Sequence, residues 1–341
     1  MKVDLNTRRR LGRSALEVPP LGFGAAHLGG MYSRVSSAAA CDTLAAAWGA
    51  DIRYFDTAPY YGLGLSEMRV GNFLVDKPRA SYVLTTKVGR TLKHPDDLPN
   101  FDRTPWQGGL NREVVFDFTY DGVMRSYEQS LHRLGVDYID ALLIHDPDAS
   151  LGTDVHTSRM RDMATSGIRA LEELKKSSLI SAIGMGLNAA ESLTEIAPLV
   201  PLDFCIVAMP YTLLDQSALQ TGLKRCVEQE ISVIIGAPFA SGILATGPGP
   251  NAKYRYGPAE PEIQEKVAKI MSVCDRHHVP LPAAALQFPL AHPSVVCVIP
   301  GGMKAEEVVA NVHNIGVDID GEFWRELREL NLIDPEAPTP T

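Results

Sequence analysis

The chain has 341 residues, of which 45% are hydrophobic and 21% are charged, a balance typical of globular proteins with a large core. Its length suits one barrel-sized domain as well as two smaller ones. Lys and Arg number 32 against 41 Asp and Glu, a net charge of −9, and the longest basic run is Arg8-Arg9-Arg10. This balance argues against nucleic acid as a main partner. No stretch of roughly 20 apolar residues is present, so we expect a cytoplasmic protein with no membrane partner.

Cysteine and histidine usage points to neither a disulfide framework nor a metal site. The five cysteines include no C-x-x-C pair, and four of them stand in apolar surroundings, so we expect reduced structural thiols. The nine histidines show no ligand spacing such as H-E-x-x-H, so we expect no metal.

Short apolar runs rich in Val and Ile alternate with longer segments of helical period, which is the pattern of repeated βα units around a parallel sheet. The expected strands are Pro20–Gly24, Ile52–Asp56, Tyr82–Val88, Tyr138–His145, Ile180–Gly186, Phe204–Met209, Ile231–Ala237 and Val295–Pro300. The expected helices include Val123–Leu134, Gly167–Lys176, Leu219–Glu230 and Ile263–His277. Eight βα units close a (β/α)8 barrel of about 250 residues. The sequence therefore predicts an α/β protein with this TIM-barrel architecture.

The remaining residues decorate the barrel. We expect a single domain over residues 1–331 and a tail at 332–341, which holds three prolines and should lie on the surface or be disordered. Residues 8–19 read as a hairpin that turns at Gly12-Arg13 or Arg13-Ser14 and plugs one end of the barrel. Three loops after strands, at 89–118, 146–166 and 241–262, exceed the usual βα connection of about 2–6 residues. They lie at the end where barrels bind ligands.

Four chemically active side chains lie at or just beyond the ends of three consecutive strands: Asp56 and Tyr61, Lys87, and His145. Taken singly, each has an ordinary structural interpretation, such as a turn residue or a packed core side chain. In a barrel, however, these strand ends converge on one mouth. A lysine there loses solvation and needs a carboxylate, which Asp56 can supply. The cation should lower the pKa of the Tyr61 phenol from its ordinary value of about 10.

The order and spacing of these residues resemble the aldo-keto reductases over nearly the whole chain. The matching motifs are Arg10-Leu11-Gly12-Arg13-Ser14, Asp56-Thr57-Ala58 with Tyr61-Gly62, Ser66-Glu67, Thr86-Lys87, Ser130-Leu131 with Arg133-Leu134-Gly135, Tyr138-Ile139-Asp140 with His145, Ile183-Gly184 and Ile299-Pro300-Gly301. The resemblance implies that Asp56, Tyr61, Lys87 and His145 form a catalytic tetrad in which Tyr61 donates or accepts the proton. It also implies a nicotinamide cofactor bound without a Rossmann fold, and no G-x-G-x-x-G opens a helix after the first strand.

The family's cofactor positions can be followed along the chain. The resemblance implies cofactor contacts from Asn188, Tyr211, Pro238, Phe239, Ser241, Gly242, Leu244, Gly301, Gly302, Met303, Lys304, Glu307 and Asn311. Asn188 resembles the asparagine that holds the nicotinamide carboxamide, although Leu187 replaces the usual serine before it and Ala208 replaces a frequent glutamine. Gly236 stands where many members have a tyrosine that stacks on nicotinamide. Tyr211 or Phe239 must then cover that ring, or nothing does.

The residues after the last strand bear on cofactor choice. Gly301 and Gly302 lead into a helix expected near Ala305, whose first amides can hold a phosphate, although two glycines can also form a plain turn. Relatives that prefer NADP carry Lys, Ser and Arg two, three and eight residues after the isoleucine, where this chain has Gly301, Gly302 and Glu307. A carboxylate repels a 2′-phosphate and accepts a hydrogen bond from a ribose hydroxyl. We therefore expect a preference for NAD, although Lys304 could still attract a phosphate.

Three further motifs resemble one branch of the family. Val115–Asp121, Ile144–Asp148 and Tyr211–Gln216 are similar to segments of the branch that contains L-fucose or D-threo-aldose 1-dehydrogenase, L-galactose dehydrogenase-like and pyridoxal 4-dehydrogenase-like proteins. This resemblance implies a small-molecule substrate, a cyclic hemiacetal such as an aldose, oxidised to a lactone. The alternatives are pyridoxal 4-dehydrogenase, an NADPH-dependent aldehyde or ketone reductase, and a non-catalytic nicotinamide-binding subunit. His27, Tyr60 and Trp106, with Phe239, are the candidates for the substrate pocket.

Overall fold

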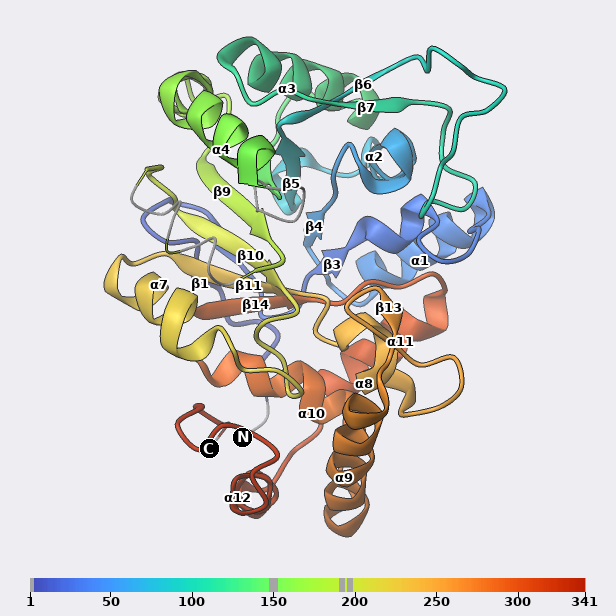
Figure 1. The fold of residues 1–341 in the computed structure, drawn as a ribbon, viewed down its shortest axis with the longest axis vertical. Coiled ribbons are helices and arrows are strands. Elements are labelled where there is room, and N and C mark those ends of the chain that lie inside the picture. Colours follow the sequence, from blue (N-terminus) through green and yellow to red (C-terminus); the bar gives the residue numbers. More distant parts are fainter. Residues whose placement is uncertain (1–2, 147–152, 190–193, 195–198, 341) are drawn as a thin grey trace.

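The computed structural model describes residues 3–146, 153–189, 194 and 199–340, and its centre is a sheet of eight parallel strands (Figure 1). In sheet order the strands are β14 (Val295–Ile299), β11 (Ser232–Gly236), β10 (Phe204–Ala208), β9 (Ala182–Leu187), β8 (Ala141–His145), β5 (Val83–Val88), β4 (Tyr54–Asp56) and β3 (Phe23–Gly24). All eight predicted strands are confirmed, and β9 runs one residue further than predicted, to Leu187.

The sheet closes on itself between its first and last strands. Parallel bridges join Leu21 to Val298 and Gly24 to Gly301, and the Gly22 amide donates to the Val298 carbonyl at 2.9 Å. Closure leaves no exposed sheet edge and makes the predicted (β/α)8 barrel. Four of the eight strands are buried from end to end, and each of the other four is buried at all but one residue, as the continuous apolar runs predicted.

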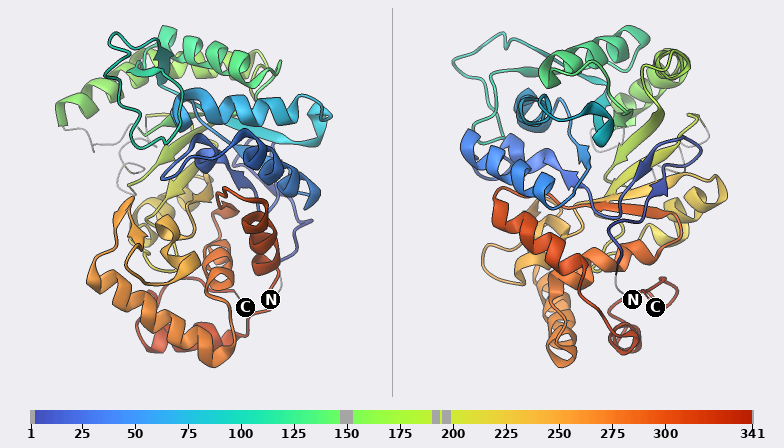
Figure 2. Two further views of the ribbon diagram at one scale, coloured as in Figure 1. Left: turned by 90° about the vertical axis from the view of Figure 1, so that its right-hand side faces the viewer. Right: turned by 180° about the vertical axis from the view of Figure 1, so that it is seen from behind.

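Helices cover the outer face of the sheet (Figures 1 and 2). They are α1 (Ser37–Gly49), α2 (Leu65–Leu74), α3 (Tyr120–Leu134), α4 (Thr153–Asp162), α5 (Ile168–Lys176), α7 (Lys224–Glu228), α8 (Ile243–Thr246), α9 (Pro261–His277), α10 (Leu281–Gln287), α11 (Ala305–Ile315) and α12 (Gly321–Glu329). The four predicted helices are confirmed, although the helix predicted at Leu219 begins with a π-helical turn, Leu219–Leu223. Local chemistry sets the ends of α3: the Thr119 side chain caps its first turn, and Gly135 ends it at a φ of 63°.

A hairpin closes the amino-terminal end of the barrel, as predicted. β1 (Arg9–Arg10) pairs antiparallel with β2 (Glu17–Val18), and the Ser14 amide donates to the Leu11 carbonyl at 3.0 Å, so that Gly12 and Arg13 occupy the turn. A side chain at Gly12 would come within 1.9 Å of the Asp203 carbonyl oxygen. Only glycine lets the turn lie this close to the start of β10.

The barrel interior beside this hairpin is apolar. One buried cluster joins Leu11 and Val18 of the hairpin to Tyr54, Phe204 and other inward-facing residues of the strands. A larger cluster lies between the strands and the helices. The two clusters are the two faces of one sheet, because neighbouring residues of a strand point to opposite sides.

The C-terminal tail differs from its prediction. Its residues Leu332, Ile333 and Ala337 are buried in the larger cluster, and Arg328 donates to the Ala337 carbonyl at 2.9 Å. The expectation of a surface or disordered tail is wrong for these residues, because two apolar side chains before the first proline and one between the first two prolines suffice to dock the segment. The described ends of the chain lie close together near α12 (Figure 2).

Two of the long loops contain small hairpins. β6 (Arg90–Lys93) pairs with β7 (Glu113–Phe116) inside the loop after β5, and β12 (Lys253–Tyr254) pairs with β13 (Gly257–Pro258) inside the loop after β11. The loop predicted at 146–166 contains α4, and its residues 147–152 lie outside the described part of the chain.

The structure also gives the state of the cysteines and shows whether the described residues contain a metal site or a membrane-spanning helix. All five cysteines are free, and four of them are buried. Among residues 3–146, 153–189, 194 and 199–340, no helix is long and apolar enough to cross a membrane. The same residues contain no group of three His, Cys, Asp or Glu side chains suited to a metal.

Candidate active site

A cavity of about 270 Å³ lies at the carboxyl-terminal mouth of the barrel, and Tyr61, Lys87 and His145 line it. Asp56 lies next to it, buried at the end of β4. The structure thus brings together all four residues that the sequence singled out. They come from consecutive strands β4, β5 and β8 and from the turn after β4.

Lys87 and Asp56 form a buried ion pair. The Lys87 Nζ lies 2.7 Å from the Asp56 Oδ2, and each side chain is only 3% exposed. The ammonium also donates to the Thr57 carbonyl at 2.8 Å, and the Thr85 hydroxyl donates to the other oxygen of Asp56 at 2.8 Å. Burial alone would lower the pKa of Lys87, but the facing charges of Asp56 and Tyr61 raise it above its ordinary value. Lys87 therefore stays a cation.

Tyr61 lies across the ammonium of Lys87, whose Nζ is 4.6 Å from the centre of the phenol ring. A left-handed turn at Gly62 and Leu63, with φ of 64° and 56°, sets this position. A side chain at Gly62 would come within 2.6 Å of the Gly29 backbone, so the turn requires glycine. The expected lowering of the Tyr61 pKa is wrong: burial raises it, and the opposing effect of Lys87 is smaller.

His145 is an uncharged imidazole in this setting. Burial, and then the cations of Arg90 and Lys87, hold its pKa well below 6.5. Its ring meets that of Tyr61 edge to face, with the ring centres 5.8 Å apart at 88°. Its Nε2 lies 3.3 Å from the Asp146 Oδ2, and its buried Nδ1 has no hydrogen-bond partner among the residues that the structure describes. The neutral ring therefore lies between Tyr61 and Asp146 on the cavity wall.

Arg90 and Asp146 are site residues that the sequence reasoning did not identify. The Arg90 Nη2 donates to the Asp146 Oδ2 at 2.8 Å, and the Arg90 side chain is only 8% exposed. Asp146 itself lines the cavity. Both residues directly follow positions that had been singled out, Gly89 at the start of a long loop and His145 at a strand end. That adjacency was the available signal.

Of the four substrate candidates, Tyr60 and Trp106 line the cavity, whereas His27 and Phe239 do not. The rings of Tyr60 and Trp106 meet there edge to face, 5.1 Å apart at 84°. His27 does not line it. A side chain placed on Gly301 would come within 2.2 Å of the His27 Nδ1, so His27 packs against the turn after β14 instead. Its prediction as a pocket residue is therefore wrong; its ring centre lies 6.3 Å from that of Tyr32, which does line the cavity.

The cofactor candidates separate into four groups. Asn188 lines the cavity. Pro238, Phe239, Ser241 and Gly242 belong to the loop after β11. Gly301, Gly302, Met303 and Lys304 belong to the turn after β14, and Glu307 and Asn311 follow in α11. The last group, Tyr211 and Leu244, faces elsewhere.

Tyr211 and Leu244 are buried in the larger apolar cluster. The Tyr211 ring packs against Phe288, with the ring centres 5.5 Å apart, and against His292. The Leu244 amide donates to the Phe239 carbonyl at 3.1 Å, so this N–H is already used. The predictions that Tyr211 covers a nicotinamide ring and that Leu244 contacts a cofactor are therefore wrong for this structure.

Glu307 lies at the amino-terminal end of α11. Its Oε2 accepts a hydrogen bond from the Met303 amide at 2.7 Å, and a side chain at Gly302 would come within 3.5 Å of the same oxygen. The carboxylate thus occupies the place where the first amides of a helix would otherwise hold an anion.

These residues fit a nicotinamide nucleotide at both of its ends. Asn188 supplies a carboxamide on the wall of the cavity that Lys87 and Tyr61 also line, and this carboxamide can pair with that of the nicotinamide. The glycines at 301 and 302 leave the backbone open before α11, and Glu307 supplies an acceptor there. A closed barrel, a buried Lys-Asp pair beside a tyrosine, and a neutral histidine define a nicotinamide-dependent oxidoreductase that acts on a carbonyl or alcohol.

Comparison with known proteins agrees with this class. The model of the "Aldo/keto reductase family" matches residues 20–332, and the chain belongs to this family. It is 38% identical to the D-threo-aldose 1-dehydrogenase of a Pseudomonas species, over 98% of this chain and 99% of that protein. It is equally identical to the pyridoxal 4-dehydrogenase of Microbacterium luteolum, over 98% of this chain and 100% of that protein.

A solved structure shares the fold over the whole barrel. The holo form of an aldo-keto reductase from Bacillus halodurans is 26% identical, with a TM-score of 0.73 over 95% of this chain and 96% of that one. The chain is therefore an enzyme, an oxidoreductase of a family that binds nicotinamide cofactors.

Proposed function

We propose that the protein oxidises the anomeric hydroxyl group of an aldose, or of a similar cyclic hemiacetal, to a lactone. The main support is the grouping of Tyr61, Lys87 and His145 on the wall of one cavity, beside the buried carboxylate of Asp56. The similarity to D-threo-aldose 1-dehydrogenase over nearly the full length of both chains adds the substrate class.

Each of the four side chains has a role that follows from its surroundings. Tyr61, as phenolate, takes the proton of the anomeric hydroxyl. The Lys87 cation stabilises that phenolate, and it is needed all the more because burial raises the Tyr61 pKa. Asp56 holds Lys87 in place and charged. Bound NAD⁺ supplies the acceptor for the hydride that leaves C1.

His145 holds the same substrate oxygen as a neutral hydrogen-bond donor. Its lowered pKa keeps it uncharged at neutral pH, so that it adds no further cation to those of Lys87 and Arg90. A neutral imidazole carries a proton on only one of its two nitrogens, so this role requires the proton on the nitrogen that faces the substrate oxygen.

The same arrangement supports a preference for NAD over NADP. The Glu307 carboxylate lies against the Met303 amide at the start of α11, where a 2′-phosphate would need a cation or a free amide. A phosphate placed there would face the carboxylate directly, whereas a ribose hydroxyl can donate to it.

The preference is tested by exchanging the charge at two neighbouring positions. Glu307→Arg should tighten NADP⁺ binding and weaken NAD⁺ binding in a fluorescence titration. Glu306→Arg makes the same charge change one residue away, at an exposed position of α11, and should change the ratio much less. Tighter binding of NADP⁺ than of NAD⁺ by the unmodified protein would contradict the preference.

The activity is tested with the purified protein, NAD⁺ or NADP⁺, and a panel of aldoses and pyridoxal, with identification of the lactone product. We expect NADH formation with an aldose. Turnover of pyridoxal alone would instead favour the activity of the second 38% identical relative. Turnover only as NADPH-dependent reduction of aldehydes or ketones would favour the reductase alternative, and cofactor binding without turnover a non-catalytic subunit.

A further inference from the structure

A network of polar contacts runs along the wall of the cavity. The Asn188 Nδ2 donates to the Asp146 Oδ1 at 3.0 Å, and the Tyr256 hydroxyl donates to the Asn188 Oδ1 at 3.1 Å. Arg90 holds the other oxygen of Asp146 at 2.8 Å. Asp146, Asn188 and Tyr256 all line the cavity.

These hydrogen bonds determine which way the Asn188 amide points. A carboxylate only accepts hydrogen bonds, so the end of the amide that faces Asp146 must be the NH₂ group. The carbonyl oxygen of Asn188 then faces Tyr256, whose hydroxyl must be the donor. The two contacts use half of the hydrogen-bonding capacity of the amide, which has two N–H groups and two lone pairs. The other half suits a ligand carboxamide.

Tyr256 stands at the tip of the β12-β13 hairpin, in a strained conformation. Arg255 and Tyr256 form the two-residue turn with φ of 47° and 67°, a conformation that normally selects Asn and Gly. Two such residues store strain of about 1–3 kcal/mol each, of the kind that collects at ligand sites. The Tyr256 side chain is nonetheless 46% exposed, so burial of its ring does not account for its presence.

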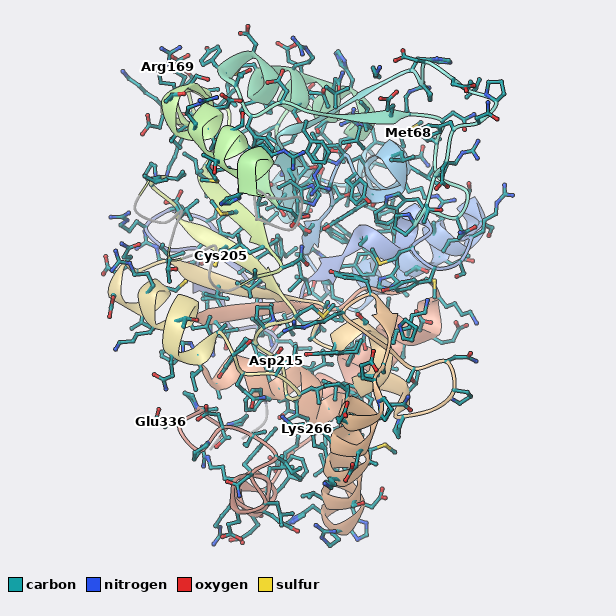
Figure 3. The ribbon with its side chains drawn as sticks, in the orientation of Figure 1. Met68, Arg169, Cys205, Asp215, Lys266 and Glu336 are labelled. Carbon is teal, nitrogen blue, oxygen red and sulfur yellow. The ribbon has the colours of Figure 1, made fainter. Side chains whose placement is uncertain are left out.

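The rest of the hairpin is anchored independently of Asn188. The Tyr256 amide donates to the Ser241 hydroxyl oxygen at 3.0 Å. The Tyr254 hydroxyl and the Arg255 guanidinium both donate to the Asp215 Oδ2 at 3.0 Å; Asp215 is labelled in Figure 3. Removal of the Tyr256 hydroxyl should therefore leave the hairpin in place.

We infer that Tyr256 is a positioning residue, which orients the Asn188 amide for the carboxamide of the nicotinamide ring. The inference rests on the proposed use of a nicotinamide cofactor. Leu187 and Ala208 also line the cavity but are apolar, so their side chains cannot hold the Asn188 amide by a hydrogen bond. Tyr256, 68 positions further along the chain than Asn188, supplies that hydrogen bond.

The test compares NAD⁺ with ADP-ribose, which has the same adenosine and phosphates but no nicotinamide. Tyr256→Phe removes only the hydroxyl. The loss of one hydrogen bond to an oriented amide should weaken NAD⁺ binding about 3- to 10-fold and leave ADP-ribose binding unchanged. The KM for NAD⁺ should rise by the same factor, while kcat stays within about twofold.

Tyr254→Phe is the matched control, because it removes the other tyrosine hydroxyl of the same hairpin, which contacts Asp215. It should change the affinity for neither ligand. In a chain that already carries Asn188→Ala, Tyr256→Phe should have no further effect, because the two residues act as one unit.

The inference is overturned if Tyr256→Phe binds NAD⁺ normally, if it weakens NAD⁺ and ADP-ribose equally, or if Tyr254→Phe has the same effect. An unmodified protein that binds neither ligand would overturn the proposed cofactor itself, and the inference with it. Normal binding by the unmodified protein with no selective effect of Tyr256→Phe removes the inference alone.

Discussion

The amino-terminal end of the barrel is filled by apolar side chains, whereas the carboxyl-terminal end holds a buried ion pair beside a cavity. At the first end, Leu11 and Val18 of the hairpin pack against Tyr54 and Phe204. At the second end, Asp56 of β4 and Lys87 of β5 belong to the same sheet but lie at the mouth. The comparison teaches that one sheet supplies stability at one end and chemistry at the other, a division typical of barrels.

Tyr61→Phe should give the largest effect, a loss of turnover without a loss of stability. The substitution removes the titrating hydroxyl and keeps the ring, so turnover should fall by about 10²–10⁴, the usual effect of losing a general acid or base. The Kd for NAD⁺ and the melting temperature should stay nearly unchanged. Near-normal turnover would show that the proton is handled elsewhere.

Leu11→Ala should lower the stability of the protein and leave its activity unchanged. Leu11 is fully buried, so the cavity left behind should lower the free energy of unfolding by about 2–5 kcal/mol. The value of kcat/KM should not change below the melting temperature. Leu330→Ala is the control, since Leu330 is 51% exposed and its truncation should cost less than about 0.5 kcal/mol. A large loss of kcat/KM in Leu11→Ala would mean that the two ends are coupled.

The pH dependence of oxidation should report the environment of Tyr61. Its phenolate is the base, and burial raises its pKa, so the reactive form is scarce at neutral pH and increases as pH rises. The oxidation rate should therefore grow up to tenfold per pH unit from about pH 6 towards pH 10. His145 should add no step near pH 6.5, because its pKa is well below that value. A plateau reached at neutral pH would contradict the raised pKa of Tyr61.

Trp106→Ala should give the smallest of these effects. Its ring is 1% exposed and forms part of the cavity wall beside Tyr60. Loss of this wall should raise the KM for the substrate about tenfold, equivalent to 1.4 kcal/mol, and leave the KM for NAD⁺ within about twofold. Equal effects on both constants, or none on either, would remove Trp106 from the substrate side.

The barrel was predictable because its strands are short, apolar on both faces and evenly spaced. The segments between the strands have the apolar periodicity of a helix, which predicts the helices. The ion pair was also predictable: a lysine at the end of an apolar strand needs a carboxylate, and Asp56 ends the strand next to it. The sequence pattern alone identifies the barrel and the ion pair, because both depend on which strands are neighbours and the order of the strands along the chain fixes this.

Other features of the site depend on opposing physical effects whose relative sizes cannot be read from the sequence. The Tyr61 pKa is the balance of burial against the Lys87 charge, and the size of the first effect requires the structure. Tyr211 and Tyr256 both follow strands in long connections, but only the second one lines the cavity. A turn with positive φ at Arg255 and Tyr256 runs against local preference, so turn rules cannot predict it.

Closure of the barrel through β3 and β14 has a consequence for how the site forms during synthesis. The four side chains of the site all belong to the first half of the chain, yet Leu21 and Gly24 pair with Val298 and Gly301 near its end. Before those residues emerge from the ribosome, the growing sheet has two open edges, which are places where chains aggregate. At that stage we expect water to reach the pair of Lys87 and Asp56, and an ion pair in water contributes only about 0–1 kcal/mol. Pairing of the final strand, which carries none of the four side chains, should then complete their burial.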